Sequence, residues 1–361
     1  MTSERMAWRG RDFASPAEFS LELGGRERDE IVSELASLKR SGRLSDSLTT
    51  SDFRFEALAR RLRAAYEEVR AGRGFVVLRG IPADALELEE FIAAVWGIGL
   101  HFGHALSQSA QGERIGHVID ATNEDATPRM FRSNLELRPH TDITAMIALA
   151  CWNRSASGGS SILTSAVTVH ERMREERPDL LEPLYRGFHY HRLGEEGEGE
   201  AAVTPYRIPV FAVRGGAVSC RYQRAGIAAG HRALGMRLSE KEIEALDLFD
   251  AIAKAPENRL AFELERGDMV VINNYTVMHA RTRFAEHAQA ERRRHLVRLW
   301  LDAEGFRDVP PEFRLFPSAN GVPPQPGRAC SYDFKKLYRD DPAAGGVPDM
   351  QLSDTEIIRG R

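Results

Sequence analysis

The sequence predicts an α+β protein that is mainly β: a sandwich or jelly roll of short strands flanked by helices. Three observations predict this fold class. Amphipathic helical patterns fill the N-terminal third, short β-type runs follow from about residue 115, and one further helical pattern interrupts those runs. The 361 residues are 42% hydrophobic and 28% charged, which is the composition of a globular protein.

The first elements are expected to be helical. Apolar residues recur at helical spacing in residues 29–38 and, more strongly, in residues 53–69. Residues 74–80 (GFVVLRG) form a β-rich run bounded by glycines, which indicates a buried strand. Residues 86–100 return to a helical pattern.

The rest of the chain is expected to be mostly strands, separated by Gly, Pro, Asn and Asp. One helix, residues 239–253, interrupts them, and Ser239 with Glu242 three residues later forms a capping box. Residues 194–202 (GEEGEGEAA) fit a solvated loop or a mobile lid. The expected strands are residues 145–152, 187–191, 208–213, 217–222, 268–272 and 295–301.

We expect a single domain over residues 1–361. It would comprise a helical N-terminal region (1–72), a jelly-roll core with insertions (73–301) and an extended arm rich in proline and glycine (302–361). Length alone would also allow two domains, but single β-rich domains often exceed 200 residues.

Charge and composition exclude several classes of protein. The net charge of -4 gives no sign of the basic face that a nucleic-acid surface needs, so a small-molecule partner is expected. No stretch approaches the roughly 18 apolar residues of a membrane span. The first 13 residues carry charges without a following apolar run, unlike a secretory signal, so a cytoplasmic location is expected.

Three cysteines, Cys151, Cys220 and Cys330, lie far apart and form no CxxC pair. This pattern argues against a disulfide framework or a zinc-thiolate site. Each cysteine is expected to be a small buried hydrophobe.

The segment RPHTD at residues 138–142 carries the first chemical signal. It lacks helix signals, and Pro139 favours extended geometry in the residue before it. In extended chain the side chains at i and i+2 point the same way, so His140 and Asp142 can converge on one metal ion. An H-x-D tripeptide is common by chance, and the pair is informative only in combination with other residues.

The second half of this metal site is expected at His279. It follows the predicted strand 268–272 and is thus delivered just past the end of a rigid element. Two histidines and one carboxylate form the facial triad of non-haem Fe(II) oxygenases, which leaves three coordination positions open. The pairs His101/His104 and His189/His191 also have ligand-like spacing, but neither has a carboxylate placed like Asp142.

An arginine-rich strand, RRRHLVRLW at residues 292–300, is the third signal. Alternation along a strand puts Arg294 and Arg298 on one face, beside Leu296 and Trp300. Two arginines among apolar neighbours are costly unless anions meet them. They are expected either to form salt bridges at the sheet edge or to make two anion sites, one for a cosubstrate and one for a substrate.

Taken together, these motifs resemble the taurine dioxygenase (TauD/TfdA) family. The matching stretches are RPHTD (138–142), GGSSILTS (158–165), and GDMVVINNYTVMHARTRF through RRRHLVRLWL within residues 267–301. The resemblance covers roughly residues 70–301. It implies a double-stranded β-helix, which is a jelly roll, and a dioxygenase that uses Fe(2+), 2-oxoglutarate and O2.

The resemblance also implies roles for single residues. His140, Asp142 and His279 would be the iron ligands, and Arg294 would grip the distal carboxylate of 2-oxoglutarate. Ser161 stands where the family usually has Thr, so its hydroxyl keeps a hydrogen bond to that carboxylate open. Arg298 would meet an acidic group of the substrate, and the retained carboxylate of Asp142 argues against halogenation.

Residues 133–136 (SNLE) depart from the pattern of taurine dioxygenase, so taurine is not implied as the substrate. The expected reaction is hydroxylation of an unactivated C–H bond in a small acidic organic molecule, with release of succinate and CO2. Alternatives are a non-catalytic jelly roll that binds a metal or small ligand, and an oxidase that uses no 2-oxoglutarate. The N-terminal helices leave a homo-oligomer open.

Overall fold

The computed structural model describes residues 5–44, 46–122, 130–317 and 320–328. Its main helices are α2 (Gly25–Arg40), α3 (Glu56–Ala71), α4 (Leu88–Gly99), α5 (Ala166–Glu176), α6 (Leu181–Arg186), α7 (Arg224–Ala233) and α8 (Glu240–Lys254). Its strands are β1 (Ser20–Glu22), β2 (Phe75–Arg79), β3 (His104–Ala105), β4 (Ile115–Val118), β5 (Leu137–His140), β6 (Met146–Asn153), β7 (Ser157–Gly158), β8 (Ser161–Ser165), β9 (Phe211–Arg214), β10 (Ala217–Cys220), β11 (Arg259–Phe262), β12 (Met269–Asn273), β13 (Val277–Arg281), β14 (Phe284–Ala285) and β15 (His295–Asp302).

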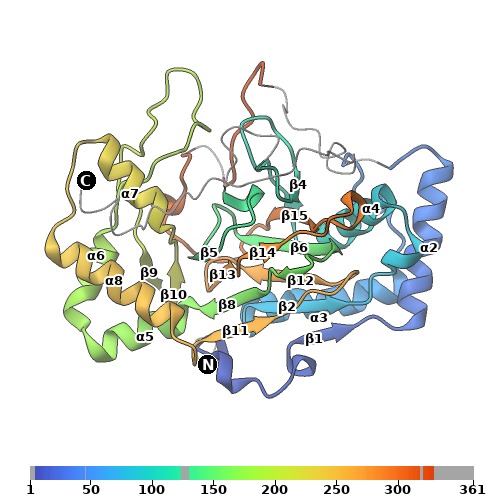
Figure 1. The fold of residues 1–361 in the computed structure, drawn as a ribbon, viewed down its shortest axis with the longest axis horizontal. Helices are drawn as coiled ribbons and strands as arrows, with labels where there is room; N and C mark the ends of the chain where they lie inside the picture. Colours follow the sequence, from blue (N-terminus) through green and yellow to red (C-terminus); the bar gives the residue numbers. More distant parts are fainter. Residues whose placement is uncertain (1–4, 45, 123–129, 318–319, 329–361) are drawn as a thin grey trace.

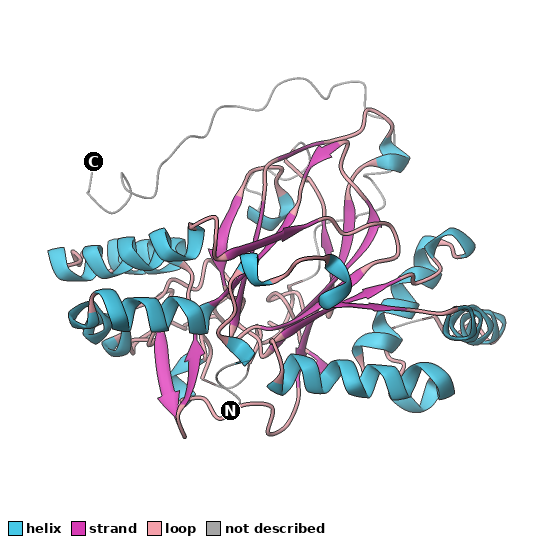
Figure 2. Cartoon of the chain, turned by 90° about the horizontal axis from the view of Figure 1, so that it is seen from below, coloured by secondary structure: helices cyan, strands magenta, loops and turns pink. Residues whose placement is uncertain are grey.

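Two sheets form the centre of the molecule. The seven-stranded sheet has the order β1-β2-β12-β6-β15-β3, and β4 also pairs with β15. The four-stranded sheet has the order β11-β8-β13-β5. Figure 1 shows these strands between helices α2 and α4 on one side and helices α5 to α8 on the other, and Figure 2 shows the same arrangement from below.

The larger sheet is buried on both faces because each face has its own hydrophobic partner. On β12, Val271 packs with helices α2, α3 and α4, whereas its neighbour Val270 packs between the two sheets. This alternation explains why β12 is a continuous apolar run rather than an alternating one. The smaller sheet is covered by the other helices, since Met278 of β13 packs with residues of α5 and α8.

Several predicted elements agree with the structure. The helix predicted at residues 239–253 is α8, and Ser239 caps it by accepting a hydrogen bond from the backbone N–H of Glu242. The strands predicted at 74–80, 145–152, 217–222, 268–272 and 295–301 correspond to β2, β6, β10, β12 and β15.

The expectation of one helix among the later strands is wrong, because α5, α6 and α7 also lie there. After its first residue, Ala166, helix α5 has the β-branched run Val167, Thr168 and Val169, and α7 contains two glycines, so both have segments of weak intrinsic helix propensity. Their buried faces pack into the cluster under the smaller sheet. Tertiary packing therefore forms these helices where local pattern does not.

The strands predicted at residues 187–191 and 208–213 are also largely wrong. The first is reduced to isolated bridges, Phe188 with Ile208 and His191 with Val203, and β9 begins only at Phe211. Pro209 has no N–H to donate to a ladder, which limits pairing here. Gly187 has a φ of +79°, and a Cβ there would lie 2.2 Å from the carbonyl oxygen of Ile208.

The segment after β15 lies against the sheets as far as the structure describes it. The backbone N–H groups of Gly321, Val322 and Gln325 donate to the carbonyl oxygens of Ile143, Ser107 and Ala110, respectively. The acidic loop at 194–202 meets the same region, since Glu195 accepts a hydrogen bond from the backbone N–H of Ala110. The predicted arm beyond residue 328 lies outside the described residues.

Cys151 and Cys220 are free and buried, as predicted, and Cys330 lies outside the described residues. In the part of the chain that the structure describes, no helix is both long and apolar enough to cross a membrane.

Candidate metal centre

The two candidate histidine ligands face each other across neighbouring strands. His140 ends β5, and its Cα pairs directly with that of His279 in β13. Directly opposed residues in an antiparallel pair share a face, so the rings meet, with centroids 4.2 Å apart. The expectation that His279 follows the end of a strand is thus wrong in detail, because it lies in the middle of the next strand.

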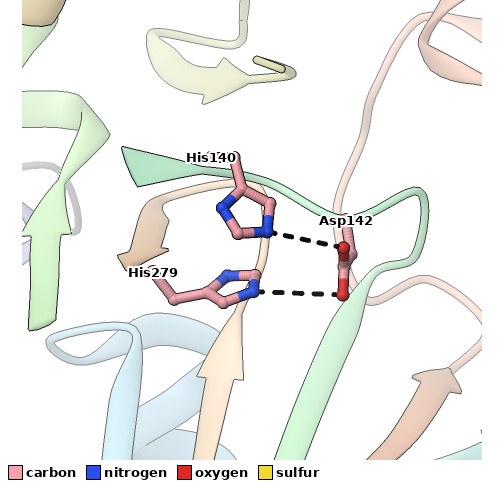
Figure 3. Close-up of side chains that lie close together, drawn as sticks. All are labelled: His140, Asp142 and His279. Atoms are coloured by element: carbon pink, nitrogen blue, oxygen red, sulfur yellow. Dashed lines mark ion pairs between the residues drawn. The ribbon is translucent and has the colours of Figure 1, made fainter. Parts of the chain in front are cut away.

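Asp142 reaches the same point from the turn that follows β5. This turn leads to β6, so it crosses from the smaller sheet to the larger one. The Asp142 carboxylate lies 3.8 Å from Nε2 of His140 and 3.9 Å from Nε2 of His279. Figure 3 shows the three side chains pointing toward one another.

One ligand atom from each of these three residues lies within 4.8 Å of the others. Within the described ranges this is the one grouping of at least three such side chains that could hold a metal ion. The pairs His101/His104 and His189/His191 belong to no such group there. The sequence signals for the triad and the geometry therefore converge on the same residues.

The protonation of the histidines suits metal binding. Nδ1 of His140 lies 2.8 Å from the carbonyl oxygen of Arg138, so it donates its proton there and leaves the Nε2 lone pair directed at the site. Burial, aided by the neighbouring His140, lowers the pKa of His279 to about 3. A neutral imidazole is the form that binds a metal.

The carboxylate of Asp142 is held ionised by its surroundings. Burial raises the pKa of Asp142, but the charge of Arg298, the two histidines and a hydrogen bond from Trp300 outweigh it and bring the pKa to about 2. Nε1 of Trp300 donates to Oδ2 at 2.8 Å, and Nη1 of Arg298 lies 3.6 Å from the same oxygen. Asp142 therefore offers an anionic ligand near neutral pH.

Arg294 and Ser161 line a single cavity together with Leu296 and Cys151. Arg294 is 5% exposed, its guanidinium lies 4.9 Å from the ring centroid of Phe284, and its Nη1 has no hydrogen-bond partner among the described residues. Burial lowers the pKa of Arg294 to about 10, yet it stays cationic near neutral pH. A buried cation with a free donor is a ready site for an anion.

Glu286 makes the stability of this region depend on pH. Its carboxylate accepts a hydrogen bond from the backbone N–H of Arg294 at 2.7 Å. Burial, reinforced by Asp120, raises the pKa of Glu286 to about 7. An acid whose pKa is raised in the folded state binds its proton more tightly there than in the unfolded chain. The free energy of unfolding therefore falls as the pH rises from about 4.5, the pKa of Glu286 in the unfolded chain, to about 7, its pKa in the folded protein.

We therefore expect Glu286→Gln to raise the Tm above that of the wild type by more at pH 8 than at pH 5. The amide of glutamine has no charge to bury, and its oxygen still accepts the hydrogen bond. The measurement is Tm against pH for the wild type and the variant. Glu265→Gln is the control, because Glu265 is a carboxylate paired with Arg154 on the surface. Parallel Tm profiles for wild type and Glu286→Gln would contradict this prediction.

Residues that the sequence did not single out hold the candidate ligands in place. Gln108, which is 2% exposed, accepts from Nε of Arg298 at 2.7 Å and donates to the carbonyl oxygen of Arg298 at 2.9 Å. Asn274 bonds the backbone of Asp142. The alternation of side chains along a strand predicted that Trp300 lies beside Arg298. The hydrogen bond from Trp300 to Asp142 could not be predicted in this way, because the two residues are 158 positions apart in the sequence. The only sequence feature that pointed to Asn274 is weak: it is the second of two asparagines, Asn273 and Asn274, at the end of β12.

Comparison with known proteins gives a consistent result. A family model described as "Taurine catabolism dioxygenase TauD, TfdA family" matches residues 40–300. "FR-33289 synthase" of Streptomyces rubellomurinus is 29% identical over 312 residues, covering 85% of this chain and 91% of the relative. "Taurine hydroxylase-like protein SAT17" of Stachybotrys chartarum is 26% identical over 324 residues, covering 86% of this chain and 82% of the relative.

Solved structures share the fold. An asparagine oxygenase in complex with Fe(II), 2S,3S-3-hydroxyasparagine and succinate has a TM-score of 0.60 at 15% identity, covering 78% of this chain and 93% of its own. The non-heme iron oxygenase OrfP in complex with Fe and alpha-ketoglutaric acid has a TM-score of 0.61 at 13% identity, covering 84% and 99%.

Proposed function

Because this chain belongs to the TauD/TfdA family of Fe(II)- and 2-oxoglutarate-dependent oxygenases, we propose that His140, Asp142 and His279 hold its iron. The chain is a dioxygenase of the 2-oxoglutarate-dependent type. The observation that carries the assignment of ligands is the convergence of two imidazoles and one ionised carboxylate. This donor set suits ferrous iron and leaves positions for other ligands.

The two packed sheets support a double-stranded β-helix as the architecture. We propose one oxygenase domain, since the N-terminal helices pack on the larger sheet and the segment 320–328 bonds to its loops. The helices would brace the two sheets that carry the proposed metal and cosubstrate residues.

Arg294 and Ser161 are the proposed binding residues for the distal carboxylate of 2-oxoglutarate. They line the same cavity, and the free Nη1 of Arg294 would donate to the carboxylate. The planar guanidinium suits a bidentate contact, which would orient the oxo-acid toward the metal. Cys151, in the same lining, has a pKa raised by burial to about 12 and stays a neutral thiol.

When bound, iron with 2-oxoglutarate and O2 supplies the oxidation: the oxo-acid is converted to succinate and CO2, and one oxygen atom enters a C–H bond of the substrate. The chain supplies binding and orientation. His279 stays neutral, Asp142 stays anionic, and Arg294 would fix the cosubstrate. A direct test is conversion of labelled 2-oxoglutarate to succinate with and without Fe(II); no iron-dependent succinate would refute the proposal.

Arg298 is the proposed contact for an acidic group on the substrate. Its guanidinium lies 4.2 Å from the ring centroid of Phe131 and 5.0 Å from that of Trp300, close to Asp142. A carboxylate, sulfonate or phosphonate would pair with it in this partly apolar setting. The substrate is therefore proposed to be a small organic acid.

Arg298→Ala is expected to weaken binding of the substrate more than binding of the cosubstrate. Losing one partner of a buried charge pair costs about 2–5 kcal/mol, or roughly 30-fold or more in affinity. Candidate acids would first be screened for stimulation of 2-oxoglutarate turnover. In the variant, the Michaelis constant for the stimulating acid should then rise by more than that for the cosubstrate, whereas Arg138→Ala, at an exposed neighbour of the triad, should change neither. A stimulating substrate without an acidic group would rule out this role.

A further inference from the structure

The two carboxylate oxygens of Asp142 have unequal surroundings. Oδ2 accepts a hydrogen bond from Nε1 of Trp300 at 2.8 Å and lies 3.6 Å from Nη1 of Arg298. Within the described part of the chain, Oδ1 receives no such donor. Both oxygens face the candidate site, since Oδ1 lies 3.8 Å from Nε2 of His140 and Oδ2 lies 3.9 Å from Nε2 of His279. Because the hydrogen bond from Trp300 takes one lone pair of Oδ2 and Arg298 draws on its charge, Oδ1 is the better donor for a metal.

The backbone of Asp142 is fixed separately from its carboxylate. Oδ1 of Asn274 accepts from the backbone N–H of Asp142 at 3.1 Å, and Nδ2 of Asn274 donates to the Asp142 carbonyl. Arg221, which is 2% exposed, donates to the same carbonyl. The main chain therefore stays in place whatever holds the side chain, and the direction of the carboxylate depends on Trp300 and Arg298.

Trp300 is itself held rigidly. It lies in β15, paired with Ile147 of β6, and its carbonyl oxygen accepts from the backbone N–H of Leu106 at 2.8 Å. The ring is 5% exposed and packs in the cluster between the two sheets. A planar side chain fixed in this way points its one N–H in a single direction, toward Oδ2.

We propose that Trp300 is a positioning residue that holds Oδ2 of Asp142 and so presents Oδ1 to the metal as the main ligand atom. The proposal rests on the metal site proposed above. A carboxylate free to turn could bind through both oxygens and occupy a position that the cosubstrate needs. Partners that orient a metal ligand in this way typically account for 10–100-fold in metal affinity.

The test compares Trp300→Phe with the wild type by titrating Co(II) into metal-free protein without oxygen. Calorimetry gives the affinity, and the visible absorption of Co(II) reports its coordination. Phenylalanine keeps an aromatic face beside Arg298 but has no N–H. We expect Co(II) affinity to fall by about 10–100-fold and the absorption band to change, while the metal-free protein keeps its circular dichroism spectrum.

Trp96→Phe is a closely matched control. The Trp96 ring is 2% exposed, its Nε1 donates to the carbonyl oxygen of Leu48 at 2.9 Å, and the guanidinium of Arg114 lies 5.2 Å from it. This variant loses an indole donor in a similar setting but away from the metal. Its Tm should fall while its Co(II) affinity stays that of the wild type.

The possible outcomes distinguish a failure of the positioning role of Trp300 from a failure of the proposed metal site. Wild-type affinity and spectrum in Trp300→Phe, or an equal loss of affinity in Trp96→Phe, would overturn the positioning role. Failure of the wild type itself to bind Co(II) would instead overturn the metal site. If Trp300→Phe does not fold, Trp300→Met serves as a second variant, because it fills the volume with a flexible side chain that donates no hydrogen bond.

Discussion

Asp142→Ala is expected to abolish metal-dependent turnover of 2-oxoglutarate. The change removes the one anionic ligand of the triad and leaves two imidazoles that face each other at 4.2 Å. It also removes the carboxylate that lies 3.6 Å from Nη1 of Arg298, so a divalent cation at the site would be repelled by the uncompensated charge of this arginine. Co(II) titration and iron-dependent succinate formation should both fall to the background of the metal-free protein.

A matched control variant is Asp250→Ala. The carboxylate of Asp250 accepts from the hydroxyl of Tyr222 at 2.7 Å and lies 3.5 Å from Nη1 of Arg224. Its side chain is 15% exposed, against 13% for Asp142. Losing this carboxylate should lower the Tm and leave Co(II) binding in place. Normal succinate production by Asp142→Ala would refute the assignment of the triad.

The parts of the fold that the sequence predicted are those whose signals are local. Helix α8 has a capping box at Ser239, and β12 is a short apolar run that follows the turn at Gly267. In both, the residues that define the ends are adjacent to those that form the element. In helices α5 and α7 the local helix propensity is weak, and these helices form because their buried faces pack against the rest of the protein. A local sequence pattern therefore does not predict them.

The candidate site was predicted in its residues but not in its geometry. Alternation along an extended chain predicted that His140 and Asp142 converge, although Asp142 lies beyond the end of β5. What joins His140 to His279 is the pairing of β5 with β13, and a register between strands so distant in sequence is set by the whole sheet. The roles of Trp300, Asn274 and Gln108 depend on the same long-range pairing.

Alternation was more successful on β15. It predicted that Arg294, Leu296, Arg298 and Trp300 share a face. Leu296 and Trp300 both pack between the sheets, whereas Arg294 precedes β15 and the register shifts between His295 and Leu296. Leu296 lines the cavity of Arg294, while Arg298 and Trp300 both reach Asp142. Strand β15 and the residue before it thus reach both proposed binding sites, which is why one short stretch of sequence contributed so much to the prediction.

Arg294→Ala is expected to reduce the affinity for 2-oxoglutarate by roughly 30-fold or more, which corresponds to about 2–5 kcal/mol for the loss of one partner of a buried charge pair. The reason is the state of Arg294 in the structure: its side chain is buried and, in the described residues, its Nη1 has no partner. Binding of 2-oxoglutarate to metal-loaded protein without oxygen, followed by calorimetry, measures the effect. Arg307→Ala, which removes another arginine from a half-buried setting bonded to Ser219, should leave that affinity unchanged.

Two further variants separate charge from geometry at this position. Arg294→Lys keeps the charge but loses the planar fork, so its affinity should lie between those of the wild type and Arg294→Ala. Arg294→Met removes a buried cation that lacks a full set of partners, so the ligand-free protein should become more stable while 2-oxoglutarate binding is lost. This opposite response of stability and binding is expected of an arginine whose main role is to bind an anionic ligand. Unchanged affinity in all three variants would move the cosubstrate role to another residue, and a loss of both stability and affinity in Arg294→Met would indicate that Arg294 mainly supports the fold.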